Sequence, residues 1–285
     1  MNKDFVLITK KNEKIRITSY GYENLEKASC LIFVHGFKGF KDWGFWPYTW
    51  NYFADKGFFV LSFNFSHNVV GENLKEFTEL DKFANNTFSL ELAELNEILD
   101  AYLNNFFGLR SNKKIGIVGH SRGGGESLIF SSGRKEISAV ALWASVANFN
   151  RYSKRQEKEW RKDGFFEVLN TRKNQMMRLN VCLLDDIEKN KNDLLNLEKA
   201  SKNLNKPLLI IHGEQDLSVK IEEGEQIYNW SNKELTQIFK IKATGHTFDV
   251  THPFDRSNPK FDSVLEKTFE FFNHYLNWGM NENSI

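Results

Sequence analysis

The chain has 285 residues, of which 14% are aromatic and 26% are charged, a composition typical of a globular protein rather than a disordered one. Its 38 basic and 37 acidic residues give a formal net charge of +1, so the overall charge favours neither nucleic acid nor an anionic membrane as a partner. No apolar stretch approaches the roughly 20 residues that span a bilayer, and the first residues lack the apolar core of a secretory signal, which predicts a cytoplasmic protein. The two cysteines lie far apart in the sequence, and we expect free thiols.

Short apolar runs alternate with longer amphipathic segments along the chain. Residues 5–9 and 14–19 predict two antiparallel strands joined by a polar turn. Most of the later runs lack polar alternation, which is typical of strands buried on both faces of a parallel sheet; the runs are 31–34, 59–63, 115–118, 140–143, 208–211 and 238–241. Apolar residues at helical spacing predict helices at 46–56, 92–106, 122–132, 222–230 and 262–277. This order predicts an α/β fold with a doubly wound, mostly parallel sheet.

One connection is much longer than a crossover requires. After the sixth strand, residues 151–206 are charged and favour helix, with short apolar islands that include Met176 and Met177. We expect a small helical cap here, inserted into a core domain formed by residues 1–150 and 207–285. The basic run at its start, residues 151–162, predicts a solvated face, and the two methionines are expected to contact the substrate.

The strongest motif is Gly119-His120-Ser121-Arg122-Gly123, which follows a buried strand and precedes an apolar helical segment. A G-x-S-x-G pentapeptide between a strand and a helix is the nucleophile elbow, a turn so tight that only glycine fits on either side of the serine. This context favours Ser121 as a nucleophile over a chance match in a turn.

A nucleophilic serine needs a general base, and the base needs an acid to orient it. His246 follows the last strand and precedes the final helix, and Asp216 follows a buried strand, so the order is Ser, Asp, His. Three other carboxylates compete with Asp216 for the acid role: Glu214, Asp249 and Asp255. Asp216 is preferred because sites in open α/β sheets form at the carboxyl ends of strands. His120, His212 and His252 lack the spacing of a metal site, and no metal is expected.

The loop that follows the strand 31–34 begins with His35-Gly36-Phe37. A loop at this position can supply one backbone N–H of an oxyanion hole, which we assign to Phe37, while the N–H of Arg122 supplies the other. We expect His35, Gly36 and His120 to contact the substrate beside these donors.

Together these motifs resemble the α/β-hydrolase superfamily over residues 30–150 and 205–278. The nearest branch is similar to the dienelactone-hydrolase-like and cinnamoyl or feruloyl esterase-like enzymes. The resemblance is carried by His35-Gly36-Phe37, Gly119 to Gly124, His212 to Asp216, and Gly245-His246. It implies ester hydrolysis through an acyl-enzyme without a cofactor, and a cap that shapes the pocket. Dienelactone hydrolases proper carry cysteine as the nucleophile, so Ser121 argues against that reaction.

We therefore expect a serine hydrolase that cleaves carboxylic esters, with aryl or cinnamoyl-type esters as candidates. The expected partner is a small-molecule ester, with no nucleic acid and no membrane, and a homodimer is left open. A small peptidase or aminopeptidase of the prolyl-oligopeptidase kind remains an alternative, for which Asp185 and Asp186 could bind the substrate amine. A binding module without catalysis on the same fold is the second alternative.

Overall fold

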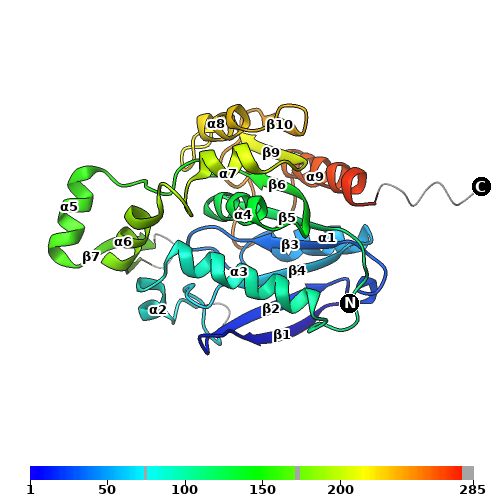
Figure 1. The fold of residues 1–285 in the computed structure, drawn as a ribbon, viewed down its shortest axis with the longest axis horizontal. Coiled ribbons are helices and arrows are strands. Elements are labelled where there is room, and N and C mark those ends of the chain that lie inside the picture. Colours follow the sequence, from blue (N-terminus) through cyan, green and yellow to red (C-terminus); the bar gives the residue numbers. More distant parts are fainter. Residues whose placement is uncertain (74–75, 171–173, 278–285) are drawn as a thin grey trace, which may run out of the picture.

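A computed structural model of the chain describes residues 1–73, 76–170 and 174–277. Its centre is one sheet of eight strands in the order β1-β2-β4-β3-β5-β6-β9-β10 (Figure 1). The strands are β1 (Lys3–Ile8), β2 (Lys14–Tyr20), β4 (Phe59–Asn64), β3 (Cys30–Val34), β5 (Ile115–His120), β6 (Ile137–Trp143), β9 (Leu208–Gly213) and β10 (Thr236–Ile241). β1 and β2 pair antiparallel with each other, β2 pairs antiparallel with β4, and all other pairs are parallel. The predicted mostly parallel sheet with N-terminal antiparallel strands is confirmed.

Burial along the strands follows from their place in the sheet. Every residue of β3, β4, β5 and β9 is buried, as expected for strands covered on both faces. The edge strands β1 and β10 instead mix buried or half-buried residues with exposed ones. The continuous apolar runs in the sequence therefore mark the centre of the sheet, where the strand ends carry the candidate site.

Helices cover both faces of the sheet (Figure 1). On one side, α4 contacts α3 and α7, and α7 contacts α8; on the other, α1 contacts α9. The bounds of these helices are α1 (Trp46–Asp55), α3 (Phe88–Leu103), α4 (Arg122–Gly133), α7 (Leu197–Asn203), α8 (Ile221–Trp230) and α9 (Pro259–Asn277). Two shorter helices, η1 (Tyr22–Asn24) and α2 (Leu80–Ala84), lie in connections. Among the described residues, no helix is both long and apolar enough to cross a bilayer.

The long connection between β6 and β9 contains more than helices. α5 (Lys154–Asp163) is followed by a two-stranded antiparallel hairpin of β7 (Phe165–Asn170) and β8 (Gln175–Asn180), and then by α6 (Val181–Asn190). Residues 171–173 of the predicted insertion lie outside the described residues. The hairpin packs against α2, and α6 contacts α3, so this part of the chain lies beside the sheet at the left of Figure 1. α7 packs on α4 and α8 and thus serves as the crossover helix of the core. The division into core and cap stays a prediction.

Candidate active site

Ser121 lies between the end of β5 and the start of α4, in a backbone conformation that few residues other than glycine adopt. Its φ is 59° and its ψ is −123°, a combination that costs of order 1–3 kcal/mol and persists only where the surroundings impose it. The N–H of Ser121 donates to the carbonyl of Trp143 on the neighbouring strand at 2.9 Å, and its own carbonyl accepts from Gly124 N at 3.0 Å. A Cβ on Gly119 would lie 2.7 Å from the carbonyl carbon of Gly123, so the turn requires glycine there. This geometry is that of a nucleophile elbow.

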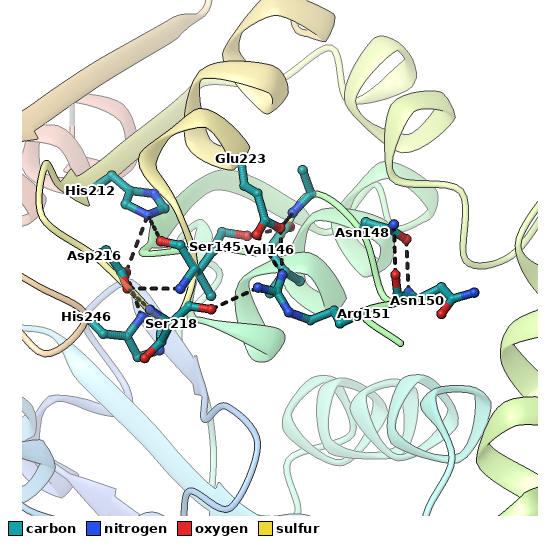
Figure 2. Close-up of polar contacts among 12 residues, drawn as sticks. Ser145, Val146, Asn148, Asn150, Arg151, His212, Asp216, Ser218, Glu223 and His246 are labelled. Carbon is teal, nitrogen blue, oxygen red and sulfur yellow. Dashed lines mark hydrogen bonds and ion pairs between the residues drawn. The ribbon is translucent and has the colours of Figure 1, made fainter. Parts of the chain in front are cut away.

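His246 and Asp216 lie in hydrogen-bond contact on two different loops. The Nδ1 atom of His246, in the turn after β10, is 2.7 Å from Oδ2 of Asp216, in the turn after β9 (Figure 2). The other carboxylate oxygen, Oδ1, accepts the backbone N–H groups of Ser218 at 2.8 Å and Val219 at 2.9 Å. An ionised carboxylate can only accept, so Nδ1 of His246 carries the proton and Nε2 is left as an acceptor.

The environment of Asp216 favours its ionised form. Burial by itself would raise the pKa of this fully buried carboxyl, but its contacts with His212 and His246 and the N–H of Val219 outweigh burial, and the pKa lies below its ordinary value. Asp216 therefore stays charged beside His246 over the physiological range.

His212 is a further member of this network, although the sequence did not predict it as a site residue. It is fully buried, its Nε2–H donates to the carbonyl of Val219 at 2.8 Å, and the same nitrogen is 3.5 Å from Oδ2 of Asp216. It thus contacts both ends of the turn from Asp216 to Val219; Figure 2 shows its ring beside Asp216. Its spacing in His-Gly-x-x-Asp was the one sequence signal that linked it to the acid.

The competing carboxylates are engaged elsewhere or exposed. Asp249 accepts the hydroxyl of Thr244 at 2.7 Å and pairs with Lys260 at 2.6 Å. Asp255 is exposed, with Arg256 at 3.8 Å, and Glu214 is exposed. Asp216 is thus the one of the four that the structure brings to His246.

The loop after β3 passes directly beside the serine. A Cβ on Gly36 would lie 2.9 Å from the Cβ of Ser121 and 3.5 Å from its Oγ, so the backbone reaches this point only because residue 36 is glycine. Phe37 follows it and packs on Phe83 with ring centroids 5.5 Å apart. Arg122 is the first residue of α4, and the N–H of a first helical residue has no acceptor within its own helix. The two predicted oxyanion donors thus belong to the two segments that flank Ser121.

The side chain of Arg122 is held by two buried glutamates. It pairs with Glu91 and lies 3.3 Å from Glu126, and its guanidinium stacks over the ring of Phe88 at 4.6 Å. Burial, together with the nearby Glu91, raises the pKa of Glu126 well above its ordinary value, so Glu126 keeps its proton and Glu91 carries the charge that pairs with Arg122. This cluster fixes the start of α4 next to Ser121.

Of the substrate contacts predicted beside the oxyanion donors, two line a cavity at Ser121 and one does not. Gly36 and His120 line a cavity of about 150 Å³ next to Ser121. The Nε2–H of His120 also donates to the carbonyl of His246 at 3.0 Å, and burial, followed by the nearby His246, lowers its pKa to about 3, so it is neutral. His35 is buried, contacts the carbonyl of Gly36 through Nδ1 at 3.0 Å, and is absent from the lining of both cavities at Ser121.

Met176 and Met177 are not among the residues that line the cavities at Ser121. They line a separate cavity between the hairpin and α2, together with Leu80 and Ala84. Met177 is buried and Met176 is 50% exposed, as expected for neighbours that point to opposite sides of a strand. The predicted contact of these residues with a substrate therefore finds no support in the lining of the two cavities at Ser121.

A second and larger cavity, of about 420 Å³, also opens at Ser121. Ser121, His246, Phe37 and Lys38 line both cavities. The smaller one is walled mainly by aromatic side chains, and the larger one by a mixture of apolar and cationic side chains. Within the described part of the chain, no three His, Cys, Asp or Glu side chains converge as a metal site would require.

Comparisons with known proteins agree with this fold. Residues 102–279, more than half of the chain, match the family described as BAAT / acyl-CoA thioester hydrolase C terminal. No curated protein matches the sequence.

Among solved structures, the alpha/beta hydrolase GrgF from Penicillium sp. sh18 is 15% identical, with a TM-score of 0.73 over 98% of this chain and 100% of that one. Est1E from Butyrivibrio proteoclasticus, solved with ferulic acid, is 16% identical, with a TM-score of 0.70 over 95% and 98%. The esterase Pf2001 from Pyrococcus furiosus is 18% identical, with a TM-score of 0.64 over 97% and 91%. At these identities the likeness concerns the fold, and the expected α/β-hydrolase fold is confirmed. The chain therefore belongs to the BAAT / acyl-CoA thioester hydrolase C-terminal family and is a hydrolase with the α/β-hydrolase fold.

Proposed function

We propose that this protein is a serine hydrolase that cleaves carboxylic esters through an acyl-enzyme on Ser121. The observation that carries the proposal is the 2.7 Å contact between His246 and Asp216, on loops that meet the strained elbow of Ser121. Ser121 and His246 also line the same two cavities, which gives a substrate access to both.

In the proposed reaction, Nε2 of His246 takes the proton of the Ser121 hydroxyl as its oxygen attacks the ester carbonyl. The negative charge that develops on the carbonyl oxygen is stabilised by the N–H groups of Phe37 and Arg122. The imidazolium, held by Asp216 through Nδ1–H, then protonates the departing alcohol. Water attacks the acyl-enzyme in the same way, with His246 again as base, and the acid is released.

The lining of the smaller cavity favours a substrate with an aromatic or other flat group. Its walls include Trp43, Trp46, Phe77 and Phe37, and its volume of about 150 Å³ suits a group of modest size. The fold neighbour Est1E was solved with ferulic acid, which is such a group. Aryl and cinnamoyl-type esters therefore remain the first substrates to test.

We further propose that residues 151–206 cap the site. Support comes from residues at the start of this segment and on its hairpin, and not from Met176 or Met177. Arg151 and Tyr152 line the larger cavity, and Asn170, the last residue of β7, lines the smaller one. The Nζ of Lys38, on the loop beside Ser121, donates to the carbonyl of Leu169 at 3.3 Å. A cover of this kind excludes water from the oxyanion and strengthens its hydrogen bonds.

The family description favours one further candidate, a thioester hydrolase, because the same residues could cleave a thioester. No observation favours the aminopeptidase. Asp185 pairs with Arg161 at 2.8 Å, Asp186 accepts the N–H of Ser89 at 3.0 Å, and among the described residues no carboxylate lines either cavity at Ser121.

The proposal is tested by the rates of hydrolysis of four substrates: an aryl acetate, a feruloyl ester, an acyl-CoA thioester and an aminoacyl anilide. We expect turnover of an ester or thioester by the wild-type protein and a loss of roughly 10⁴-fold or more in kcat for Ser121→Ala. Equal rates in the two proteins, or turnover of the anilide alone, would contradict the proposal.

A further inference from the structure

The two cavities that meet at Ser121 differ in charge. Three residues with cationic side chains, Lys38, Arg122 and Arg151, belong to the lining of the larger one, and no Asp or Glu is among its described lining residues. The smaller one contains only Lys38 of these three. A substrate that spans both cavities would therefore meet positive charge mainly on one side of the reacting carbonyl.

Arg151 is held in place by Glu223, which lies outside the lining of the larger cavity, and by Ser218, which belongs to that lining. Its Nη1 donates to both carboxylate oxygens of Glu223, at 2.7 and 2.8 Å, and its Nη2 donates to the carbonyl of Ser218 at 2.9 Å (Figure 2). Glu223 also accepts the backbone N–H of Ala147 at 2.9 Å and is not part of the cavity lining. The side chain of Arg151 nevertheless remains 39% exposed. A guanidinium fixed in this way loses little further freedom when it binds an anion.

A tyrosine lies on the same wall. The ring of Tyr152 is set by edge contacts with Trp160, 4.9 Å away, and Phe166, 5.6 Å away, both from the insertion. Burial raises the pKa of its hydroxyl, against the opposing effect of the nearby Arg122 and Arg151, so the group remains an O–H donor. Arg122, Arg151 and Tyr152 are thus all lining residues of the larger cavity, and both arginines lie near the tyrosine hydroxyl.

We infer that the larger cavity binds a carboxylate carried by the substrate, and that Arg151 is the residue that determines this specificity. The inference rests on the proposed function, because it assumes that the reacting carbonyl lies at Ser121. Arg122, Lys38 and Tyr152 complete the anion-binding wall, and the uncharged end of the substrate occupies the aromatic cavity. The substrate class is accordingly an ester that bears a carboxylate on one side of the scissile bond.

Matched pairs of esters test this inference on either side of the bond. Monoethyl adipate carries the carboxylate on the acyl side and is compared with its amide, ethyl adipamate. 4-Acetoxybenzoate carries it on the alcohol side and is compared with 4-acetoxybenzamide. We expect kcat/KM to favour the anion in one of the two pairs by about 10- to 100-fold, the ratio that one charge-assisted hydrogen bond supports. The pair that shows the preference identifies which half of the ester enters the larger cavity.

Arg151 could recognise the charge of the substrate, or it could only hold two loops together through Glu223. Two variants with opposite expected effects on the anion-to-amide ratio distinguish these roles. Arg151→Gln should lower the anion-to-amide ratio by about 10-fold or more. Glu223→Gln should raise it, because the variant removes the counter-charge of Arg151 while its amide oxygen still accepts the N–H of Ala147. The control is Arg155→Gln on α5, where the exposed arginine pairs with Glu159, and it should leave both ratios unchanged.

The same comparison is made without turnover by measuring, with calorimetry, how each of the four compounds binds to Ser121→Ala, alone and combined with Arg151→Gln. Tighter binding of one anion than of its amide, lost with Arg151→Gln, supports the inference even if no ester is turned over. The inference is overturned if both anions bind no more tightly than their amides. It is also overturned if Arg151→Gln and Glu223→Gln change the ratio in the same direction. If the enzyme cleaves the ester bond of the amide-bearing compounds as fast as that of the anions, the proposed function stands and only the carboxylate site is ruled out.

Discussion

Replacement of Asp216 by Asn tests the acid with a change of a single group, and the structure predicts which way the new amide will face. Oδ1 of Asp216 accepts two backbone N–H groups, at 2.8 and 2.9 Å, while Oδ2 accepts the proton on Nδ1 of His246 at 2.7 Å. In Asp216→Asn, the amide oxygen must stay with the two N–H donors, so the amide NH₂ faces His246. Nδ1 must then accept, the ring proton moves to Nε2, and Nε2 can no longer take the proton of Ser121.

The expected loss in kcat is about 10⁴-fold, which corresponds to about 5 kcal/mol in the activation barrier. KM should change little, because Asp216 lies outside the lining of both cavities. Steady-state kinetics on an aryl ester measures both quantities, and thermal unfolding checks that the variant is folded. Asp249→Asn is the matched control, since its carboxylate pairs with Lys260. A folded Asp216→Asn with more than a tenth of the wild-type kcat, or a larger loss in Asp249→Asn, would refute this assignment.

Three further predictions concern stability and the insertion. The pKa of Asp216 is lowered in the folded chain, so its ionisation stabilises the fold at pH values above the unfolded pKa of about 3.9. This stabilisation is lost as the pH falls below about 4. Urea unfolding between pH 3 and 6 should therefore show a weaker acid dependence for Asp216→Asn than for the wild type. Gly119→Ala should destabilise the fold by about 1–3 kcal/mol and distort the elbow. Gly133→Ala, with no atom within 4 Å of the added Cβ, should be neutral or slightly stabilising. Equal effects of the two substitutions would contradict the close approach of Gly119 to Gly123. Met177→Ala should lower the free energy of unfolding by about 2–5 kcal/mol and Met176→Ala by less than about 0.5 kcal/mol. The order of kcat/KM among esters should be unchanged in both variants. A changed order in a stable variant would indicate that these residues contact the substrate.

Patterns of a few consecutive residues were sufficient to predict the sheet and the elbow. Strands such as Cys30–Val34 and Leu208–Gly213 are continuous apolar runs because the sheet covers them on both faces. The glycines of the pentapeptide around Ser121 are required by contacts within the turn itself. In both cases the physical constraint acts on neighbours in the sequence, so the sequence alone carries it.

The hairpin in the insertion could not be predicted in the same way. Phe165–Asn170 and Gln175–Asn180 are short and interrupted by polar residues, and their pairing is supported by packing on α2, more than 90 residues before the second strand in the chain. A helix would have allowed Met176 and Met177 to lie on one side of the insertion, whereas the strand turns them to opposite sides. The expectation that both methionines face one pocket thus followed from the expectation of a helix at these residues.

The polar network behind the site also depends on contacts that the sequence does not display. Arg151 belongs to a basic run that was expected to be solvated, and this holds for Arg155, whose side chain is 86% exposed. Arg151 is instead tied to Glu223 and Ser218, which follow it by about 70 residues. His212 acts through the carbonyl of Val219, a partner set by the turn and not by side-chain type.

The most direct test of the account is the site at which an activated phosphonate reacts. A fluorophosphonate should modify the wild-type protein at one residue, and peptide mass spectrometry should place the adduct on Ser121. The Ser121→Ala variant should remain unlabelled under the same conditions, and His246→Ala should be labelled far more slowly, because the serine has lost its base. An adduct on another residue, or labelling of Ser121→Ala at the wild-type rate, would contradict the assignment of Ser121 as the nucleophile.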